Sequence, residues 1–204
     1  MQSAYRVNEI FYSLQGEGCH AGTPAVFVRL SGCNLRCPFC DTDHSAATPM
    51  TADEILAAAA AHPARHVVFT GGEPALQLDE ALLSAFRRAG YYIQVETNGT
   101  FPLPVALIDW VTCSPKFEFT EPRLPLRLER IDELKVVYDT TNRMELYAPG
   151  SPHLPVAPAH HTLQPCDTGD PTRNAAITSA AIAYCLAHPR WRLSLQTHKL
   201  LAIP

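Results

Sequence analysis

Three closely spaced cysteines are the clearest sign of chemistry in this sequence. Cys33, Cys37 and Cys40 form a C-x3-C-x2-C pattern within SGCNLRCPFCDTDH, residues 31–44. Three soft thiolates on one short loop can close on a metal or cluster at low entropic cost, because the chain already holds them near one another. A [4Fe–4S] cube has four irons, so three cysteines would leave one iron free to bind another molecule.

Structural zinc is the main alternative for these thiols. A structural zinc site is closed by four ligands, and Cys19, His20 or His44 would have to supply the fourth. On spacing alone, a zinc-binding structural or regulatory module therefore stays open.

A glycine-rich turn is the second feature that can do chemistry. Gly71, Gly72, Glu73 and Pro74 follow a short apolar run at residues 66–69. Glycines lack a Cβ and let the main chain approach a ligand closely, and a glutamate can stabilise an ammonium group. The turn comes one strand–helix unit after the cysteine loop, and the pair is more specific than either motif alone.

The elements that must position these loops follow from hydrophobic patterning. Short apolar runs alternate with helical patterns, which is typical of an α/β fold with a parallel sheet. Thr51 and Glu54 match a capping box at a helix start, and Gly90 is placed to end the next helix. Residues 149–171 are proline-rich and are expected to form an ordered, extended loop. Strands are expected at residues 24–30, 66–69, 91–96, 133–138 and 192–198, and helices at 51–62, 78–89, 105–109 and 174–188.

Length and composition predict one domain spanning residues 1–204. Lys and Arg number 16 against 20 Asp and Glu, which gives a net charge of −4. The chain therefore lacks the basic balance that sequence-independent nucleic-acid binding needs. A hydrophobic content of 47% excludes wholesale disorder. The seven cysteines are an odd number, which excludes a fully paired internal disulfide framework.

No targeting or membrane segment is expected. Residues 1–18 hold no apolar stretch of signal-peptide length. The longest apolar run, ILAAAAA from Ile55, is far shorter than the ~20 residues that cross a bilayer. The protein is therefore expected in the cytoplasm, where thiols stay reduced.

The cysteine loop resembles that of the radical S-adenosylmethionine (SAM) superfamily, whose motif is C-x3-C-x-aromatic-C. Phe39 occupies the aromatic position, and the GGEP turn is similar to the motif at the superfamily's second strand. The resemblance implies an abbreviated, partial (βα) barrel. It also implies that the three cysteines hold a [4Fe–4S] cluster, that Phe39 packs near the SAM adenine, and that the GGEP turn binds the methionine amino group.

Further motifs resemble the 7-carboxy-7-deazaguanine synthase family over residues 11–204: FYSLQGEG, CDTDH, TGGEP, ETNGT, SPK, LQP and QTHKLLAIP. The resemblance implies a carbon–nitrogen lyase that converts 6-carboxy-5,6,7,8-tetrahydropterin to 7-carboxy-7-deazaguanine with loss of ammonia. In that family a 5′-deoxyadenosyl radical abstracts the C6 hydrogen, the ring contracts and SAM is regenerated. The product is a precursor of queuosine in tRNA.

The family resemblance also implies ligand contacts, residue by residue. Thr42 would bind a Mg²⁺ that the substrate shares, since a hydroxyl is a hard oxygen ligand; the alternative is a residue that only turns the loop. No side chain is assigned as catalytic, because SAM and the cluster carry the radical chemistry. Contacts with SAM are implied for Phe39, Gly71, Gly72, Glu73, Glu96, Ser114, Pro115, Lys116, Gln164, Pro165, Cys166 and Asp167. Contacts with the substrate are implied for Leu14, Gln15, Gly16, Glu17, Arg29, Thr70, His198 and Pro204.

Two of these residues have a plain local alternative. Arg29 would bind the substrate carboxylate in a bidentate manner, or else it is a surface-facing strand residue. Glu96 would accept hydrogen bonds from the SAM ribose, or else cap the turn at ETNG. In the family, the carboxylate of the terminal proline reaches the aminopyrimidine edge of the substrate, and Pro204 matches that position.

The resemblance further implies a homodimer, a small-molecule pterin substrate and a flavodoxin-like electron donor, with no nucleic-acid or membrane partner. A glycyl-radical-activating enzyme is the alternative among radical SAM enzymes. It would share the cysteine loop and the GGEP turn, but it would not need the LQGEG motif or the HKLLAIP tail.

Overall fold

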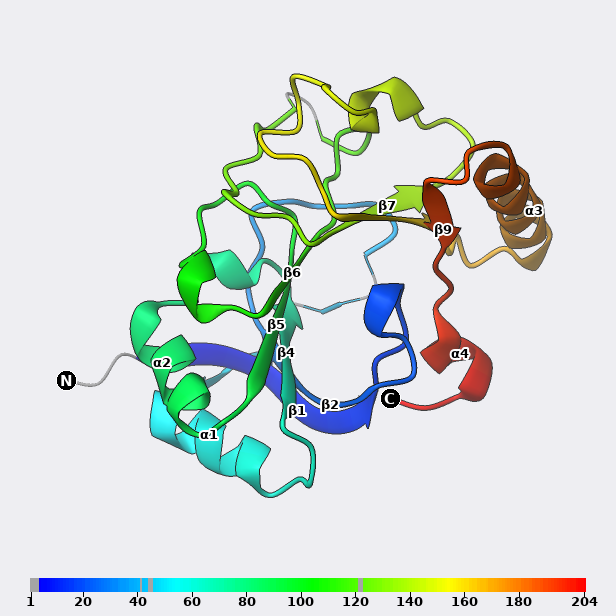
Figure 1. Cartoon of the computed structure of the whole chain (residues 1–204). Helices are drawn as coiled ribbons and strands as arrows, with labels where there is room; N and C mark the ends of the chain where they lie inside the picture. The colour runs from blue at the N-terminus through cyan, green and yellow to red at the C-terminus, as the bar shows by residue number, and fades with distance from the viewer. Residues whose placement is uncertain (1–3, 41, 44–45, 121–122) are drawn as a thin grey trace.

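The computed structural model describes residues 4–40, 42–43, 46–120 and 123–204, and their strands form one nine-stranded sheet. The strands are β1 (Tyr5–Leu14), β2 (Pro24–Leu30), β3 (Thr48–Met50), β4 (His66–Gly71), β5 (Tyr92–Thr97), β6 (Trp110–Cys113), β7 (Glu133–Tyr138), β8 (His160–Pro165) and β9 (Trp191–Leu193). Their order in the sheet is β3-β1-β2-β4-β5-β6-β7-β8-β9. Neighbours from β2 to β9 are parallel, whereas β1 pairs antiparallel with β2 and β3. The sheet curls into an incomplete barrel (Figure 1), which confirms the expected fold class.

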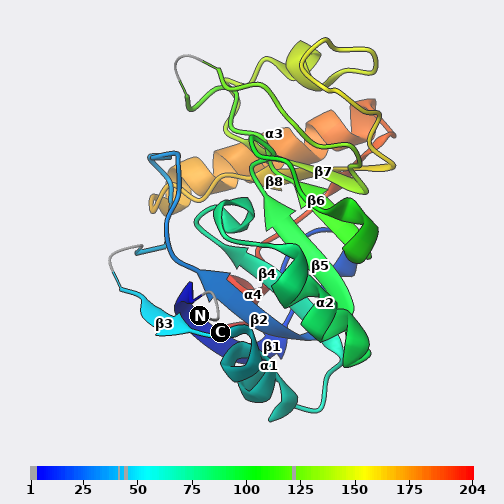
Figure 2. The same cartoon turned by 90° about the vertical axis from the view of Figure 1, so that its left-hand side faces the viewer.

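Helices cover the outside of this sheet near its two ends. Helices α1 (Ala52–Ala60) and α2 (Glu80–Arg88) lie together beside the first parallel strands, and α3 (Pro171–Ala187) packs on β8 and β9 (Figure 2). The predicted capping box of α1 is present, because Thr51 accepts the N–H of Glu54 and the Glu54 carboxylate accepts that of Thr51. In the described part of the chain, no helix is long and apolar enough to cross a membrane.

Strands β2 and β4 separate two groups of buried side chains. On β4, Phe69 faces the helices and meets Phe86 of α2, with ring centroids 5.1 Å apart. Val68 points the other way and packs with Ala25 and Phe27 of β2. Successive side chains of a strand face opposite sides, and a sheet buried on both sides needs apolar residues at every position. This explains the unbroken apolar runs in these strands.

Two expectations for the C-terminal part of the chain are wrong. Residues 149–171 contain strand β8 rather than an uninterrupted loop. The proline within β8, Pro165, is its last residue, so the pairing inside the strand loses no donor. Strand β9 ends at Leu193, and the expected end of that strand instead forms helix α4 (Thr197–Leu201), which carries His198. A contact distant in sequence holds this helix, since Thr197 donates its N–H to Gly16 O at 2.9 Å.

Two strands and one short helix also differ from the expected elements. Strands β1 and β3 were not expected; a register shift between Val7 and Glu9 interrupts the pairing of β1 with β2. The helix expected at residues 105–109 is a single 3-10 turn, Val105–Leu107.

Candidate active site

A cavity of about 290 Å³ lies at the carboxyl ends of the parallel strands, where folds of this kind place their sites. The structure brings nearly all of the predicted site residues to it. Two predicted residues, Glu73 and Pro115, do not line it. Those that do are Leu14, Gln15, Gly16, Glu17, Arg29, Cys33, Cys37, Phe39, Cys40, Thr42, Thr70, Gly71, Gly72, Glu96, Ser114, Lys116, Gln164, Pro165, Cys166, Asp167, His198 and Pro204.

The three motif cysteines line this cavity from the loop after β2. Cys33 and Cys37 are half-buried and Cys40 is exposed. Main-chain contacts shape the loop, because Cys40 donates its N–H to Cys37 O at 3.1 Å. Burial raises the pKa of Cys33 and of Cys37, so their thiolate forms need a cationic partner such as iron to persist at neutral pH.

The donor set fits a cluster with one open iron. Cys33, Cys37 and Cys40 line the cavity as three thiols from one loop, enough for three of the four irons of a cube. A cube binds each thiolate through a different iron, so its ligands stand further apart than those of one ion. Of the proposed zinc ligands, His44 lies outside the described residues. The His20 ring packs edge-on against Trp110, with centroids 4.5 Å apart.

The glycine turn packs directly against the cysteine loop. Gly72 donates its N–H to Leu30 O at 3.0 Å, and Glu73 donates its N–H to Gly32 O at 2.9 Å. A Cβ on Gly72 would lie 2.1 Å from Gly32 O, and one on Gly71 would lie 2.1 Å from Leu30 O. Only glycine fits at either position. Both glycines also line the cavity, as the three thiols do.

The Glu73 side chain is fully buried and does not line that cavity. Its Oε1 accepts the Thr97 hydroxyl at 2.6 Å and the Ala75 N–H at 2.9 Å, and its Oε2 accepts the Asn98 N–H at 2.7 Å. Burial raises the pKa of Glu73, although these hydrogen bonds oppose the shift. The carboxylate thus ties the turn after β4 to the end of β5.

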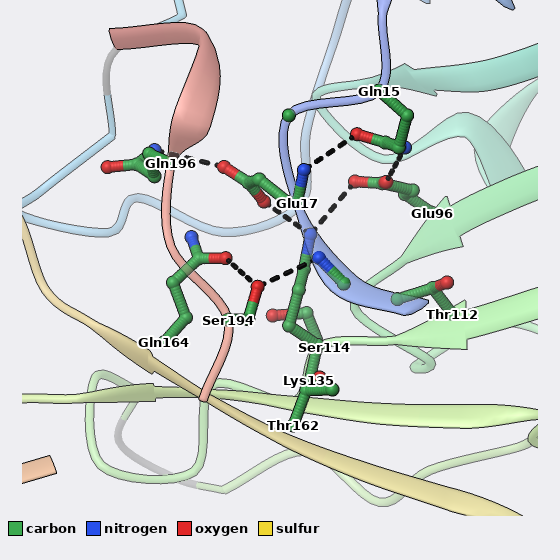
Figure 3. A network of polar contacts seen from close by, with 12 residues as sticks. Gln15, Glu17, Glu96, Thr112, Ser114, Lys135, Thr162, Gln164, Ser194 and Gln196 are labelled. Carbon is green, nitrogen blue, oxygen red and sulfur yellow. Dashed lines mark hydrogen bonds and ion pairs between the residues drawn. The ribbon is translucent and has the colours of Figure 1, made fainter. Parts of the chain in front are cut away.

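An ion-pair triad of Glu17, Lys135 and Glu96 forms one wall of the cavity (Figure 3). Lys135 Nζ lies 2.5 Å from Glu17 Oε2 and 3.1 Å from Glu96 Oε2. Gln15 donates to Glu96 Oε1 at 2.8 Å, and Gln196 donates to Glu17 Oε1 at 3.0 Å. Burial disfavours the charge of Glu17, but the Lys135 ammonium outweighs this effect and lowers the pKa of Glu17 to about 2.

The loop that carries Gln15, Gly16 and Glu17 is fixed at the next residues along the chain. Gly18 donates its N–H to the Ser194 hydroxyl at 2.8 Å, and Cys19 donates its N–H to Glu133 Oε2 at 3.1 Å. Gly18 has a φ of +68°, and a Cβ there would lie 2.5 Å from Glu133 Oε1. These contacts hold the loop inside the barrel.

Arg29 and Thr42 meet on another side of the cavity. An Arg29 nitrogen lies 3.4 Å from the Thr42 hydroxyl, and the Arg29 Nε forms an ion pair with Glu9 at 2.7 Å. The predicted carboxylate-binding cation is therefore a neighbour of the predicted Mg²⁺ ligand.

The last residues of the sequence pack over the cavity from α4. A Cβ on Gly16 would lie 2.2 Å from His198 Nδ1, so His198 lies directly against the loop after β1. Lys199 pairs with Asp167 at 2.7 Å. Ser13 donates its hydroxyl to the main-chain oxygen of Pro204 at 2.7 Å.

Sequence reasoning missed several residues that line the cavity, and Lys135 is the most informative of them. The sequence carried a signal for it, because Glu133 and Lys135 are charged residues two positions apart in an otherwise apolar strand. Residues with this spacing share one face of a strand, and a charge inside a parallel sheet needs a partner. The other lining residues that were missed are Phe11, Phe27, Leu35, Thr97, Asn98, Val137, Gln196 and Lys199.

Comparisons with known proteins agree with this geometry. Residues 27–111 match the Radical SAM superfamily. The chain is 51% identical over 199 residues to a 7-carboxy-7-deazaguanine synthase of Bacteroides thetaiotaomicron, covering 97% of this chain and 98% of that protein. It is 48% identical over 224 residues to the 7-carboxy-7-deazaguanine synthase of Bordetella pertussis, covering 98% and 100%. Among solved structures, it resembles QueE from Escherichia coli with a TM-score of 0.76 and 29% identity, over 94% of this chain and 93% of that one.

Proposed function

The chain belongs to the 7-carboxy-7-deazaguanine synthase family of radical SAM enzymes, and from this we propose which residues carry each part of its reaction. The enzyme is a lyase that converts 6-carboxy-5,6,7,8-tetrahydropterin to 7-carboxy-7-deazaguanine with a [4Fe–4S] cluster and SAM. One observation carries the residue assignments. Three thiols, a glycine cradle, a cation beside a hydroxyl and a wall of carboxylates all face one cavity. We take residues 1–204 as a single catalytic domain around it.

The cofactor side of the cavity is formed by the cysteine loop and the GGEP turn. Cys33, Cys37 and Cys40 would hold the cluster, and when bound, the cluster and SAM supply the radical that removes the C6 hydrogen of the substrate. The main chain of Gly71 and Gly72 would bind the amino group of SAM. Phe39 would pack on the adenine.

Further SAM contacts would come from the ends of later strands. Glu96, on β5, would accept hydrogen bonds from the ribose. Ser114 and Lys116 after β6, and residues 164–167 at the end of β8, also line the cavity and would complete the SAM contacts.

The substrate side of the cavity has a cation, Arg29, at one place and carboxylates at another. Arg29 would bind the substrate carboxylate, and Thr42 would supply an oxygen ligand to a Mg²⁺ that this carboxylate shares. Gln15, Glu17, His198 and Pro204 would read the aminopyrimidine edge, with Leu14, Gly16 and Thr70 packing against the ring. This arrangement holds the substrate in one orientation, with its C6 toward SAM.

Two macromolecular partners complete the proposal. A flavodoxin-like protein would deliver the electron, which the exposure of Cys40 at the edge of the cluster loop supports. A second copy of the chain would form a homodimer. Exposed leucines are available to such an interface, since Leu186 on α3 and Leu200 on α4 are 79% and 73% exposed.

Anaerobic reconstitution followed by turnover tests this function. We expect a brown protein with broad absorption near ~400 nm and roughly four irons per chain. With SAM, reductant, Mg²⁺ and the carboxy-tetrahydropterin, it should form the deazaguanine. A colourless protein with one zinc would favour a zinc module. A reconstituted cluster that cleaves SAM but leaves the pterin unchanged would favour a glycyl-radical-activating enzyme.

A further inference from the structure

Lys135 joins two parts of the cavity that are distant in the sequence. Its side chain is 5% exposed, and its ammonium contacts a carboxylate from the loop after β1 and another from β5. Figure 3 shows Glu17 and Glu96 converging on this one cation. A buried ammonium with two carboxylate partners fixes both side chains, since each contact is a charge-assisted hydrogen bond.

The charge balance of this triad leaves it one negative charge in excess. Two carboxylates face one ammonium, and the remaining carboxylate oxygens already accept side-chain amides from Gln15 and Gln196. Carboxylate oxygens each carry a second lone pair. The wall can therefore accept further hydrogen bonds from a ligand, and it favours groups rich in N–H and O–H donors.

Glu133, two residues before Lys135 on β7, is a charged residue with a purely structural role and serves as a comparison. Glu133 is 1% exposed and does not line the cavity, and its carboxylate accepts the Thr162 hydroxyl at 2.6 Å and the Cys19 N–H at 3.1 Å. Lys135 differs because it and both of its partners line the cavity.

We propose that Lys135 is a positioning residue for the reaction, whose buried ammonium keeps Glu17 and Glu96 side by side as carboxylates that accept the N–H donors of the aminopyrimidine and the O–H donors of SAM. This inference rests on the proposed function. It adds the device that orients the substrate. The donor-rich edge of the pterin faces the triad, and its carboxylate faces Arg29.

Loss of the ammonium would act through Glu17. Burial pushes the pKa of this carboxyl up, and Lys135 pulls it down to about 2. Without Lys135, the carboxylate of Glu17 loses the main charge that opposes the effect of burial, and the pKa of Glu17 should rise. Below the raised pKa the ionised fraction falls about tenfold per pH unit. The other charged groups facing Glu17 are Glu96 on β5, His198 on α4 and Lys116 after β6.

The test measures binding rather than turnover. Reconstituted, SAM-bound holoenzyme without reductant is titrated with 6-carboxypterin, a fluorescent oxidised analogue that keeps the aminopyrimidine edge. Each Kd is divided by the wild-type Kd at the same pH, so that the pH dependence of the ligand and of groups common to both proteins cancels. The variants are K135M, K135R and the double variant K135M/E17Q, which keeps the wild-type net charge of the triad. The control is R87M, which removes a cation from an exposed ion pair with Asp109.

We expect the K135M ratio to rise about tenfold per unit as pH falls below the shifted pKa of Glu17. The K135R ratio should stay below roughly ten at every pH, the double variant should give a pH-independent ratio, and R87M should give a ratio near one. A pH-independent ratio for K135M, whether small or large, would overturn the proposal, because a merely structural role weakens binding equally at every pH.

Iron content and circular dichroism show whether each variant is folded and carries its cluster, so the test still gives a result if K135M does not fold. Folding of K135M/E17Q where K135M fails would support the charge argument, because the two variants differ only in the carboxylate of Glu17. Failure of both variants while R87M folds would make Lys135 a folding residue and would overturn the positioning role. Wild-type enzyme that does not bind 6-carboxypterin would instead refute the substrate assignment of the proposed function.

Discussion

The residues of the GGEP turn have different roles. The main chain of Gly71 and Gly72 faces the cavity, while the Glu73 carboxylate is buried and accepts three hydrogen bonds from the protein. The sequence motif identifies the turn correctly, but a motif does not say which atoms of a residue meet the ligand. Lys135 could not be found from a motif. No motif contains it, and its partners lie 118 and 39 residues away.

Glu73→Gln tests the structural role of that carboxylate. The amide keeps the size of the side chain, but its NH2 group cannot accept the Asn98 N–H, so a buried donor loses its partner. We expect the free energy of unfolding to fall by about 1–3 kcal/mol, measured by anaerobic denaturant titration. Glu129→Gln, at an exposed position, should stay within about 0.5 kcal/mol of wild type. Equal stability of the two variants would show that Glu73 does not hold the turn.

Helices and strands could be predicted from the sequence where the residues that define them are close together in the chain. Strands β2 and β7 lie at the expected residues, and the α1 capping box depends on two residues three positions apart. Strand β8 and helix α4 depend on partners far along the chain. In β8, Thr162 donates to Glu133, 29 residues away, and α4 begins at Thr197, which bonds to Gly16, 181 residues away. Tertiary contacts of this kind leave no periodic signal in a single sequence.

Thr51→Ala tests a locally determined element. Loss of the N-cap hydroxyl leaves the Glu54 N–H without its acceptor, and we expect a stability loss of about 1 kcal/mol. For a chain of this size, that corresponds to a Tm decrease of roughly 2–4 °C, measured by calorimetry. Glu54→Gln should lower the Tm less, because glutamine also completes a capping box. A Tm equal to wild type in Thr51→Ala would contradict the prediction. Turnover should not change, since α1 does not line the cavity.

At the scale of the whole molecule, the site depends on the two ends of an open sheet. The sheet runs from β3 to β9, and the segment after β9 crosses back to β1. There Thr197 bonds to Gly16 and Pro204 accepts the Ser13 hydroxyl. The cavity is thus bounded by residues near both termini as well as by the strand ends between them. This explains why the family resemblance had to span most of the chain to assign the substrate.

Extension of the chain beyond Pro204 tests this closure. One added residue turns the proline carboxylate into an amide, which removes a charged acceptor from the proposed aminopyrimidine site. We expect kcat/KM for the carboxy-tetrahydropterin to fall roughly 10- to 100-fold, as for the loss of a hydrogen bond to a charged group. Iron content and the cluster absorption should not change, because the cysteine loop lies in another part of the chain. The same residue added ahead of Met1 is the control and should preserve turnover. Full activity of the C-terminally extended enzyme would remove Pro204 from the substrate site.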